Sequence, residues 1–205
     1  MLRRLFTTLC LLLLASTTHA IEEPSYQVLQ SEGACELRQY EPVLLAQVEV
    51  DGDAGDARSA GFRLLAGYIF GANQGQRKIA MTAPVTQAEV PAGEKIAMTA
   101  PVTQSAAGPS RWHVAFTMPR AYTLETLPRP NDARVQFVTV PGEKRAVIRF
   151  DGFSTEANLG RHRALLQAWV QRQGLKPLGE YVAAFYNDPF TLPWNRRNEW
   201  WVAVE

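Results

Sequence analysis

The side chains in this sequence that could bind a metal are few and widely spaced. His113 and His162 offer imidazole nitrogens, the commonest metal ligands in proteins. Met81, Met98 and Met118 could form a thioether cluster that binds a soft metal or supplies an axial ligand to one. Methionines that alternate along strands also serve as core filler, and no spacing between the histidines supports coordination. The role of these residues therefore depends on the helices and strands that carry them.

The sequence contains no arrangement typical of an enzyme active site. It has no Gly-x-Ser-x-Gly elbow, no phosphate-binding glycine loop and no His-Glu-x-x-His. Cys35 is the one cysteine outside the first twenty residues, and it lies in a strand-like segment without a histidine beside it. Scattered carboxylates occupy turns and caps, where solvation or capping accounts for them: Glu94, Glu125, Asp151 and Glu156. We expect a protein that is not an enzyme.

Residues 1–20 have the pattern of a secretory signal peptide. Arg3 and Arg4 precede an apolar run that is too short to span a bilayer, and Thr18-His19-Ala20 is a small-x-small cleavage pattern. The rest of the chain, residues 21–205, has the size of a single domain. The sequence thus predicts a protein secreted across the inner membrane, periplasmic in a Gram-negative source, with no membrane segment left after cleavage.

Charge gives no reason to expect a nucleic-acid partner. The chain has 21 basic and 20 acidic side chains, and removal of Arg3 and Arg4 leaves 19 basic groups against 20 acidic ones. A near-neutral chain without a basic block has no electrostatic affinity for phosphate backbones.

Two helices are predicted, each within a set of strands. Phe62, Leu65 and Ile69 have helical spacing after a capping Asp53 or Asp56, and Leu64 widens this apolar stripe. A second helix, at about 156–173, carries an apolar stripe that contains His162, Leu165, Leu166, Trp169 and Val170. Alternating segments around the helices give the order strand–strand–helix–strand–strand twice, with a junction at 128–132. This order predicts an α+β domain built from two similar halves.

A ten-residue repeat lies between the first helix and the following strands. The sequence Lys78-Ile-Ala-Met-Thr-Ala-Pro-Val-Thr-Gln87 recurs unchanged as Lys95 to Gln104. Ile79, Met81 and Ala83 alternate as in a strand, and Pro84 suits only a sheet edge or a strand end. We expect the copies to form adjacent strands of a hairpin at a sheet edge. Such an edge could also dock another strand, which would make the chain an envelope interaction protein.

At these residues the chain resembles the SOUL heme-binding protein family. The resemblance rests on Lys-Ile-Ala-Met-Thr-Ala-Pro-Val after Tyr68-Ile-Phe-Gly-Ala-Asn73, and on the ending Tyr186-Asn-Asp-Pro-Phe-Thr-Leu-Pro-Trp-Asn-Arg-Arg-Asn-Glu-Trp200. It implies a distorted β-barrel made of two pseudo-twofold ββαββ halves and flanked by two α-helices. It also implies noncovalent binding of heme or a related porphyrin by a carrier or buffer protein. The architecture is similar to that of effector-binding domains, so a module for another hydrophobic amphiphile, without heme ligation, stays open.

The resemblance directs attention to the two helices as the place where a tetrapyrrole would bind. His162 is the possible axial ligand, although a helix histidine can equally pack at the core edge and bond a backbone carbonyl. Met81 and Met98 are weaker ligand candidates. Some family members are thought to bind heme on the first helix. Here that helix offers an apolar surface (Phe62, Leu64, Leu65 and Ile69) and two possible propionate partners (Arg58 and Arg63). The pair Arg196-Arg197 could bind carboxylates such as Glu199, or clamp an anionic ligand. No protein partner can be named.

Overall fold

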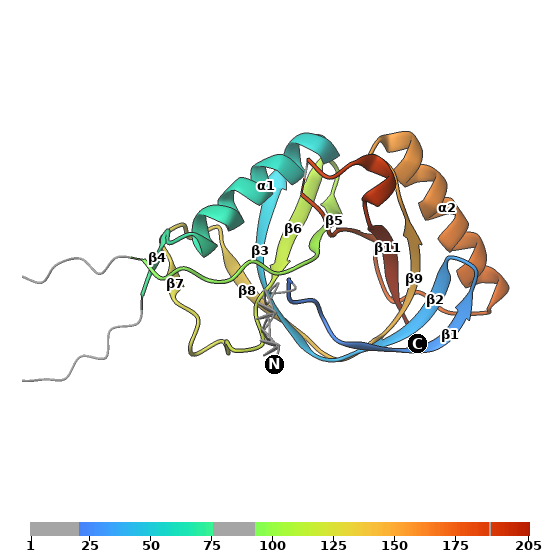
Figure 1. The fold of residues 1–205 in the computed structure, drawn as a ribbon, viewed down its shortest axis with the longest axis horizontal. Helices are drawn as coiled ribbons and strands as arrows, with labels where there is room; N and C mark the ends of the chain where they lie inside the picture. The colour runs from blue at the N-terminus through green and yellow to red at the C-terminus, as the bar shows by residue number, and fades with distance from the viewer. Residues whose placement is uncertain (1–20, 76–92, 189) are drawn as a thin grey trace, which may run out of the picture.

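One antiparallel sheet curls into a half-barrel, and two helices pack on its outer side (Figure 1). The computed structural model describes residues 21–75, 93–188 and 190–205. The predicted signal peptide, the first repeat copy and Met81 lie outside these residues. The distorted barrel with two flanking helices is confirmed.

The bounds of the elements follow the chain in this order: β1 (Tyr26–Glu32), β2 (Cys35–Tyr40), β3 (Val43–Asp51), α1 (Ala54–Ile69), β4 (Asn73–Gln74), β5 (Val102–Gly108), β6 (Arg111–Thr117), β7 (Arg129–Pro130), β8 (Gln136–Val140), β9 (Lys144–Phe150), α2 (Glu156–Arg172), β10 (Val182–Phe185), the 3-10 turn η1 (Pro193–Asn195) and β11 (Asn198–Val204). None of the helices in the described ranges has the length and hydropathy needed to cross a bilayer.

Each half pairs one of the strands before its helix with a strand of the other half. The nine strands of the main sheet are ordered β1-β2-β9-β11-β10-β5-β6-β3-β8, so β3, β5 and β6 of the first half form one unit and β9, β10 and β11 form the matching one. However, β2 pairs with β9, and β8 pairs with β3. Strands β5 and β10 join the halves at the centre, where Val102 is opposite Phe185. The closure of the sheet therefore depends on pairing between residues far apart in sequence.

Capping side chains fix where each helix begins. The Asp53 carboxylate accepts hydrogen bonds from the backbone N–H groups of Gly55 and Asp56 at 3.0 and 2.9 Å, which confirms the predicted cap of α1. The Thr155 hydroxyl accepts from the N–H of Asn158 and caps α2. Gly174, with a φ of 64°, follows the end of α2, as expected of a glycine at that position.

Each helix covers its own hydrophobic core. Beneath α1, Leu65 and Ile69 pack with Val114 and Phe116 of β6. Beneath α2, Trp169 packs with residues of β9 and β11. The predicted stripe of α2 is wrong at Leu165, which is half exposed. Helical spacing placed Leu165 near the edge of the stripe, and the sheet beneath does not reach that far.

The second repeat copy does not form an edge hairpin. Its first part, 95–98, has no regular structure, and Val102–Gln104 begin β5. Because β5 lies between β6 and β10, it presents no free edge to another strand. Ile96 is buried while Met98 is 41% exposed, so the expected shared face is also wrong for this copy. Isolated hydrogen bonds hold this segment in place. In one of them, the Ile96 N–H donates to the Ile69 carbonyl at the end of α1, at 2.8 Å.

Candidate functional site

A pocket of about 430 Å³ lies where the two halves of the domain meet, beside the middle of helix α1. Its apolar wall comes from Phe62 of α1 and from Val102 and Phe185, which are paired across the seam between β5 and β10. Phe62 makes an edge contact with Phe116, with ring centroids 5.4 Å apart. This contact holds the ring against the sheet while leaving it 38% exposed. The polar part of the lining consists of Arg58, Ser59, Arg63, Ser154, Asn187, Arg196 and Asn198.

The charged side chains that line this pocket are all positive in the described part of the chain. They are Arg58, Arg63 and Arg196, and none of the described carboxylates lines the pocket. Within the described part of the chain, no ion pair or hydrogen bond engages the guanidinium of Arg58 or Arg63. Arg58 is half-buried, with its guanidinium carbon 4.6 Å from the ring centroid of Phe185, and burial lowers its pKa from the usual arginine value. Such a partly desolvated cation would be stabilised by an anion.

The neighbouring arginines 196 and 197 have different roles. Arg197 binds Glu199 and Glu23 at 3.0 and 2.8 Å, and these ion pairs hold the segment before β1 on the sheet. Glu199 is buried on the inner side of the half-barrel, where it also accepts bonds from Arg38 and from the Tyr186 hydroxyl. Arg196 instead lines the pocket, while its Nε donates to the Thr191 carbonyl at 2.8 Å. Binding of carboxylates thus applies to Arg197, and clamping of an anionic ligand stays a prediction for Arg196.

The predicted residues of α1 divide between the pocket and the core. Arg58, Phe62 and Arg63 line the pocket together. Leu65 and Ile69 are almost fully buried beneath the helix, where they hold it on the sheet and cannot reach a ligand. Leu64 is half-buried and lines a separate hollow. The ligand-accessible part of α1 is therefore smaller than the apolar stripe suggested.

The structure places His162 away from this pocket, in a packed position on α2. Its Nδ1 lies 2.8 Å from the Asn158 carbonyl oxygen, and its ring stacks on Phe150 with centroids 4.1 Å apart and planes 6° apart. His162 is not among the residues that line the pocket. These contacts match the structural role that the sequence left open beside ligation.

The remaining ligand candidates are not gathered into a metal site. Met118 is buried in the core beneath α1, whereas Met98 is exposed. His113 lies across from Glu49 on the outer part of its strand, with 3.4 Å between Nε2 and the carboxylate. Among the described residues, no three His, Cys, Asp or Glu side chains are grouped as metal ligands would be. A thioether cluster thus has no counterpart in the part of the chain that the structure describes.

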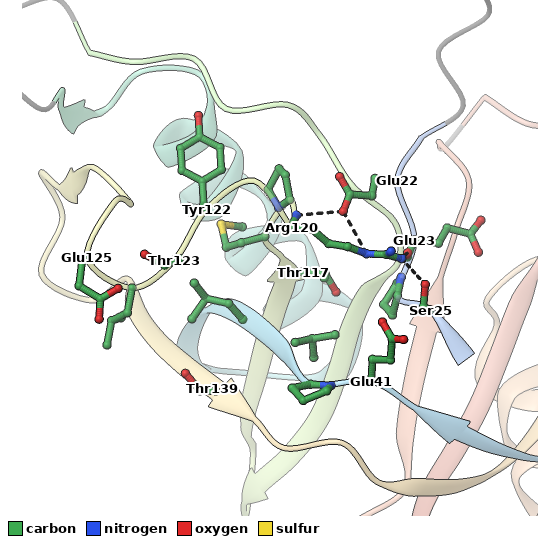
Figure 2. Close-up of a pocket in the computed structure, with 17 residues that line it drawn as sticks. Glu22, Glu23, Ser25, Glu41, Thr117, Arg120, Tyr122, Thr123, Glu125 and Thr139 are labelled. Atoms are coloured by element: carbon green, nitrogen blue, oxygen red, sulfur yellow. Dashed lines mark hydrogen bonds and ion pairs between the residues drawn. The ribbon is translucent and has the colours of Figure 1, made fainter. Parts of the chain in front are cut away.

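A second cavity, of about 470 Å³, lies beside the N-terminal segment and has a different character (Figure 2). Arg120 holds this segment in place: its backbone N–H donates to the Glu22 carboxylate at 2.9 Å, and its guanidinium donates to the Glu23 carbonyl and the Ser25 hydroxyl. Arg120 is thus engaged in tethering the chain, whereas Arg58 and Arg63 beside α1 have no hydrogen bond or ion pair with the described residues. We therefore take the pocket beside α1 as the candidate site.

Several pocket residues are supplied by segments that sequence analysis did not assign to a site. Phe185, Asn187 and Asn198 come from β10, the loop after it and the start of β11. One feature of the sequence pointed to this region: the ending from Tyr186 to Trp200 that resembles the family includes Asn187 and Asn198. Only the pairing of β10 with β5 brings this ending next to α1.

The donor set of the pocket suits the periphery of a tetrapyrrole better than its metal. Aromatic and aliphatic side chains could contact the macrocycle, and the arginines could bind its propionates. Among residues 21–75, 93–188 and 190–205, no His, Met, Cys or Tyr, the side chains that ligate heme iron, lines the pocket. The residues present therefore fit a porphyrin held by its face and its carboxylates.

Solved structures share the fold at low sequence identity. The chain is similar to the EcmrR C-terminal domain, with a TM-score of 0.60 and 10% identity over 88% of this chain and 98% of that domain. It is also similar to a protein described as a hydrolase from Listeria innocua, with a TM-score of 0.55 and 12% identity over 86% and 94% of the two chains. At this identity the likeness establishes the architecture alone.

Sequence relatives identify the family. The chain is 30% identical to heme-binding protein 2 of Homo sapiens over 198 residues, which cover 91% of this chain and 88% of the human protein. Heme-binding protein 2 of Mus musculus is 31% identical over 195 residues, with the same coverage. The model of the SOUL heme-binding protein family matches residues 21–203. The chain therefore belongs to the SOUL heme-binding protein family.

Proposed function

We propose that this protein binds heme or a related porphyrin noncovalently in the pocket beside α1. The macrocycle would lie against Phe62, Val102 and Phe185, and its propionates would bind Arg58 and Arg63. Burial of the apolar ring supplies most of the binding free energy, and charge-assisted hydrogen bonds orient it. Membership of a heme-binding family supports the ligand class.

One observation carries the proposal: Arg58 is half-buried against Phe185 without a carboxylate partner among the described residues. Removing part of the water around a guanidinium costs free energy, and folded proteins normally offset this with an ion pair. An anionic, flat and apolar ligand would satisfy both the cation and the aromatic wall.

The absence of iron-ligating side chains from the lining favours a second candidate. A different anionic amphiphile, recognised without any metal ligation, would make the same contacts with the arginines and the aromatic wall. The two candidates differ in whether the macrocycle itself is required.

In its biological role, the protein would be a secreted carrier or buffer that acts in the periplasm, and a binding protein rather than an enzyme. The signal-peptide pattern of residues 1–20 supports export, and the sequence offers no catalytic constellation.

Titration of residues 21–205 with hemin tests the proposal. We expect a saturable shift of the Soret band, and we expect Arg58→Glu/Arg63→Glu to weaken binding by more than about tenfold, since each lost contact to a charged group is worth about 1.5–3 kcal/mol. The matched control is Arg161→Glu, because Arg161 is an exposed arginine on α2 that bonds only the Asn158 side chain among the described residues. This control should bind hemin as the unmodified protein does.

Two outcomes would redirect the assignment. If His162→Ala abolished the Soret shift while the double arginine variant retained it, the site would be on α2 and the pocket assignment would be wrong. If no saturable shift occurred, but anilinonaphthalene sulfonate bound in a manner sensitive to the same arginines, the second candidate would replace heme.

A further inference from the structure

Four large apolar side chains are exposed close to the pocket. Phe190 is 91% exposed, Trp194 68%, Phe153 54% and Leu192 52%. We call these four residues the apolar rim. Isolated exposed leucines are ordinary on protein surfaces, but two phenylalanines, a tryptophan and a leucine in adjoining segments are not.

Contacts between two loops hold the rim together. The backbone N–H of Gly152 donates to the Pro193 carbonyl at 2.9 Å, which joins the loop before α2 to η1. The Arg196 guanidinium lies 4.9 Å from the centroid of the Phe153 ring. Figure 1 shows the chain entering β11 between α1 and α2, at the same end of the molecule as the start of both helices. These contacts join the two loops that carry the rim residues.

The rim borders the candidate site directly. Ser154 and Arg196 line the pocket, and each is a close chain neighbour of a rim residue. Two acidic side chains lie near the rim. The carboxylate of Asp188 accepts from the N–H groups of Phe190 and Thr191, and Asp151 lies with Trp194 at a separate hollow outside the pocket. On the pocket side, Arg58 and Arg63 add positive charge. An aromatic surface beside arginines is the chemistry that suits the interface of an anionic lipid bilayer.

We propose that the apolar rim docks on a membrane surface containing anionic lipids, so that the pocket mouth faces the interface from which an amphiphile is taken or delivered. The inference rests on the proposed function, because an apolar anionic ligand partitions into bilayers. Tryptophan and phenylalanine insert at the headgroup level, and the neighbouring arginines attract the lipid phosphates. The small size of the rim argues for lipid over protein, because a stable protein interface draws on about 20–30 residues a side.

Vesicle binding of residues 21–205 tests this docking. We expect cosedimentation with vesicles of phosphatidylcholine mixed with phosphatidylglycerol and little with phosphatidylcholine alone. Phe190→Ser/Trp194→Ser should weaken binding by about tenfold or more, because it removes both aromatic anchors. Arg63→Gln should weaken it by about fivefold, the effect of one basic side chain near a charged surface. The control Leu178→Ser/Leu124→Ser removes two side chains that are also about half exposed but lie outside the rim, and it should bind as the unmodified protein does.

Fluorescence and hemin binding separate this proposal from the proposed function. Vesicles should shift Trp194 emission to the blue, and Trp194→Phe should remove that shift. The rim variant should bind hemin in free solution with unchanged affinity, since neither Phe190 nor Trp194 lines the pocket. Unchanged vesicle binding by the rim variant would overturn the docking, as would hemin binding without any vesicle binding. Vesicle binding without hemin binding would support the docking and reject heme as the ligand.

Discussion

Helices α1 and α2 occupy matching places in the two halves, yet they differ in how their cationic side chains are used. On α2, Arg161 bonds Asn158, Arg172 pairs with Glu32, and Arg163 lies above the rings of Tyr181 and Trp200. On α1, neither arginine has a carboxylate partner in the described ranges, and both line one pocket. Arg58 also lies over a ring, that of Phe185, but neither arginine of α1 has a hydrogen bond or ion pair among the described residues, whereas two of the three arginines of α2 do. This difference indicates a role outside folding for the cations of α1.

The largest expected effect comes from removing the buried carboxylate of Glu199, which pairs with two arginines. Glu199→Ala would leave Arg38 and Arg197 without their shared buried carboxylate, so we expect the free energy of unfolding to fall by about 3–5 kcal/mol. Arg58→Ala should lower it by no more than about 1 kcal/mol, because it loses the ring contact with Phe185 but no ion pair. Urea denaturation of both variants measures the contrast. Equal losses would show that Arg58 also has a structural role.

The helices should also differ in their tolerance of one methyl group. At Gly61 of α1, an added Cβ would lie 2.6 Å from the Cβ of Val114, whereas at Gly160 of α2 it would meet nothing within 4 Å. We expect Gly61→Ala to destabilise the protein by about 1–3 kcal/mol. Gly160→Ala should stabilise it by about 0.5–1 kcal/mol through the better helix propensity of alanine. Thermal unfolding of the two variants gives the signs, and the same sign for both would contradict the difference in helix packing.

His162 gives a smaller effect and tests whether α2 is free of ligand contacts. His162→Ala removes the stacked ring on Phe150 and the bond to the Asn158 carbonyl, so it should lower stability by about 1 kcal/mol. Hemin affinity should stay the same. A Phe150→Leu variant, which alters the same stack from the other side, should behave alike. Loss of hemin binding in His162→Ala alone would assign a ligand role to α2.

The smallest effect is expected from removing the insertion that distinguishes the halves. The first half has a long segment between its helix and β5, whereas α2 is followed by β10 after a short loop. Deletion of residues 88–104 leaves one repeat copy joined to Ser105, with the sequence that β5 requires. We expect the same fold and a stability within about 1 kcal/mol, since loop length has a small entropic effect. Loss of cooperative unfolding would show that the second copy has a role that the first cannot replace.

Sequence periodicity predicted most of the elements and their duplicated order. Alternation predicted strands before and after each helix, and helical spacing located both helices, because these signals are local. Alternation could not show that β2 pairs with a strand of the second half. An alternating pattern marks a strand but does not specify which other strand it pairs with. The proline of the repeat suggested an edge, but Pro101 stands just before β5, where it removes no ladder bond.

The candidate site was predictable only in part. Arg58, Phe62 and Arg63 were found because they lie on a single helix face that the family resemblance singled out. Leu65 and Ile69 share the stripe, and helical spacing alone cannot separate residues beneath the helix from those at its margin. Phe185 and Asn198 join the site through strand pairing over more than eighty residues of sequence, which no local pattern encodes.

The strand pairing between the halves has a consequence for how such a molecule can arise. In the described sheet, β2 bonds to β1 of its own half and to β9 of the other half. A single half would therefore leave one side of β2 unpaired. Two free copies of a half would close this sheet by lending each other a strand, as in a domain-swapped dimer. The present chain corresponds to such a dimer with its two protomers joined end to end. The pocket, built across the seam, would then have come into existence with the pairing itself.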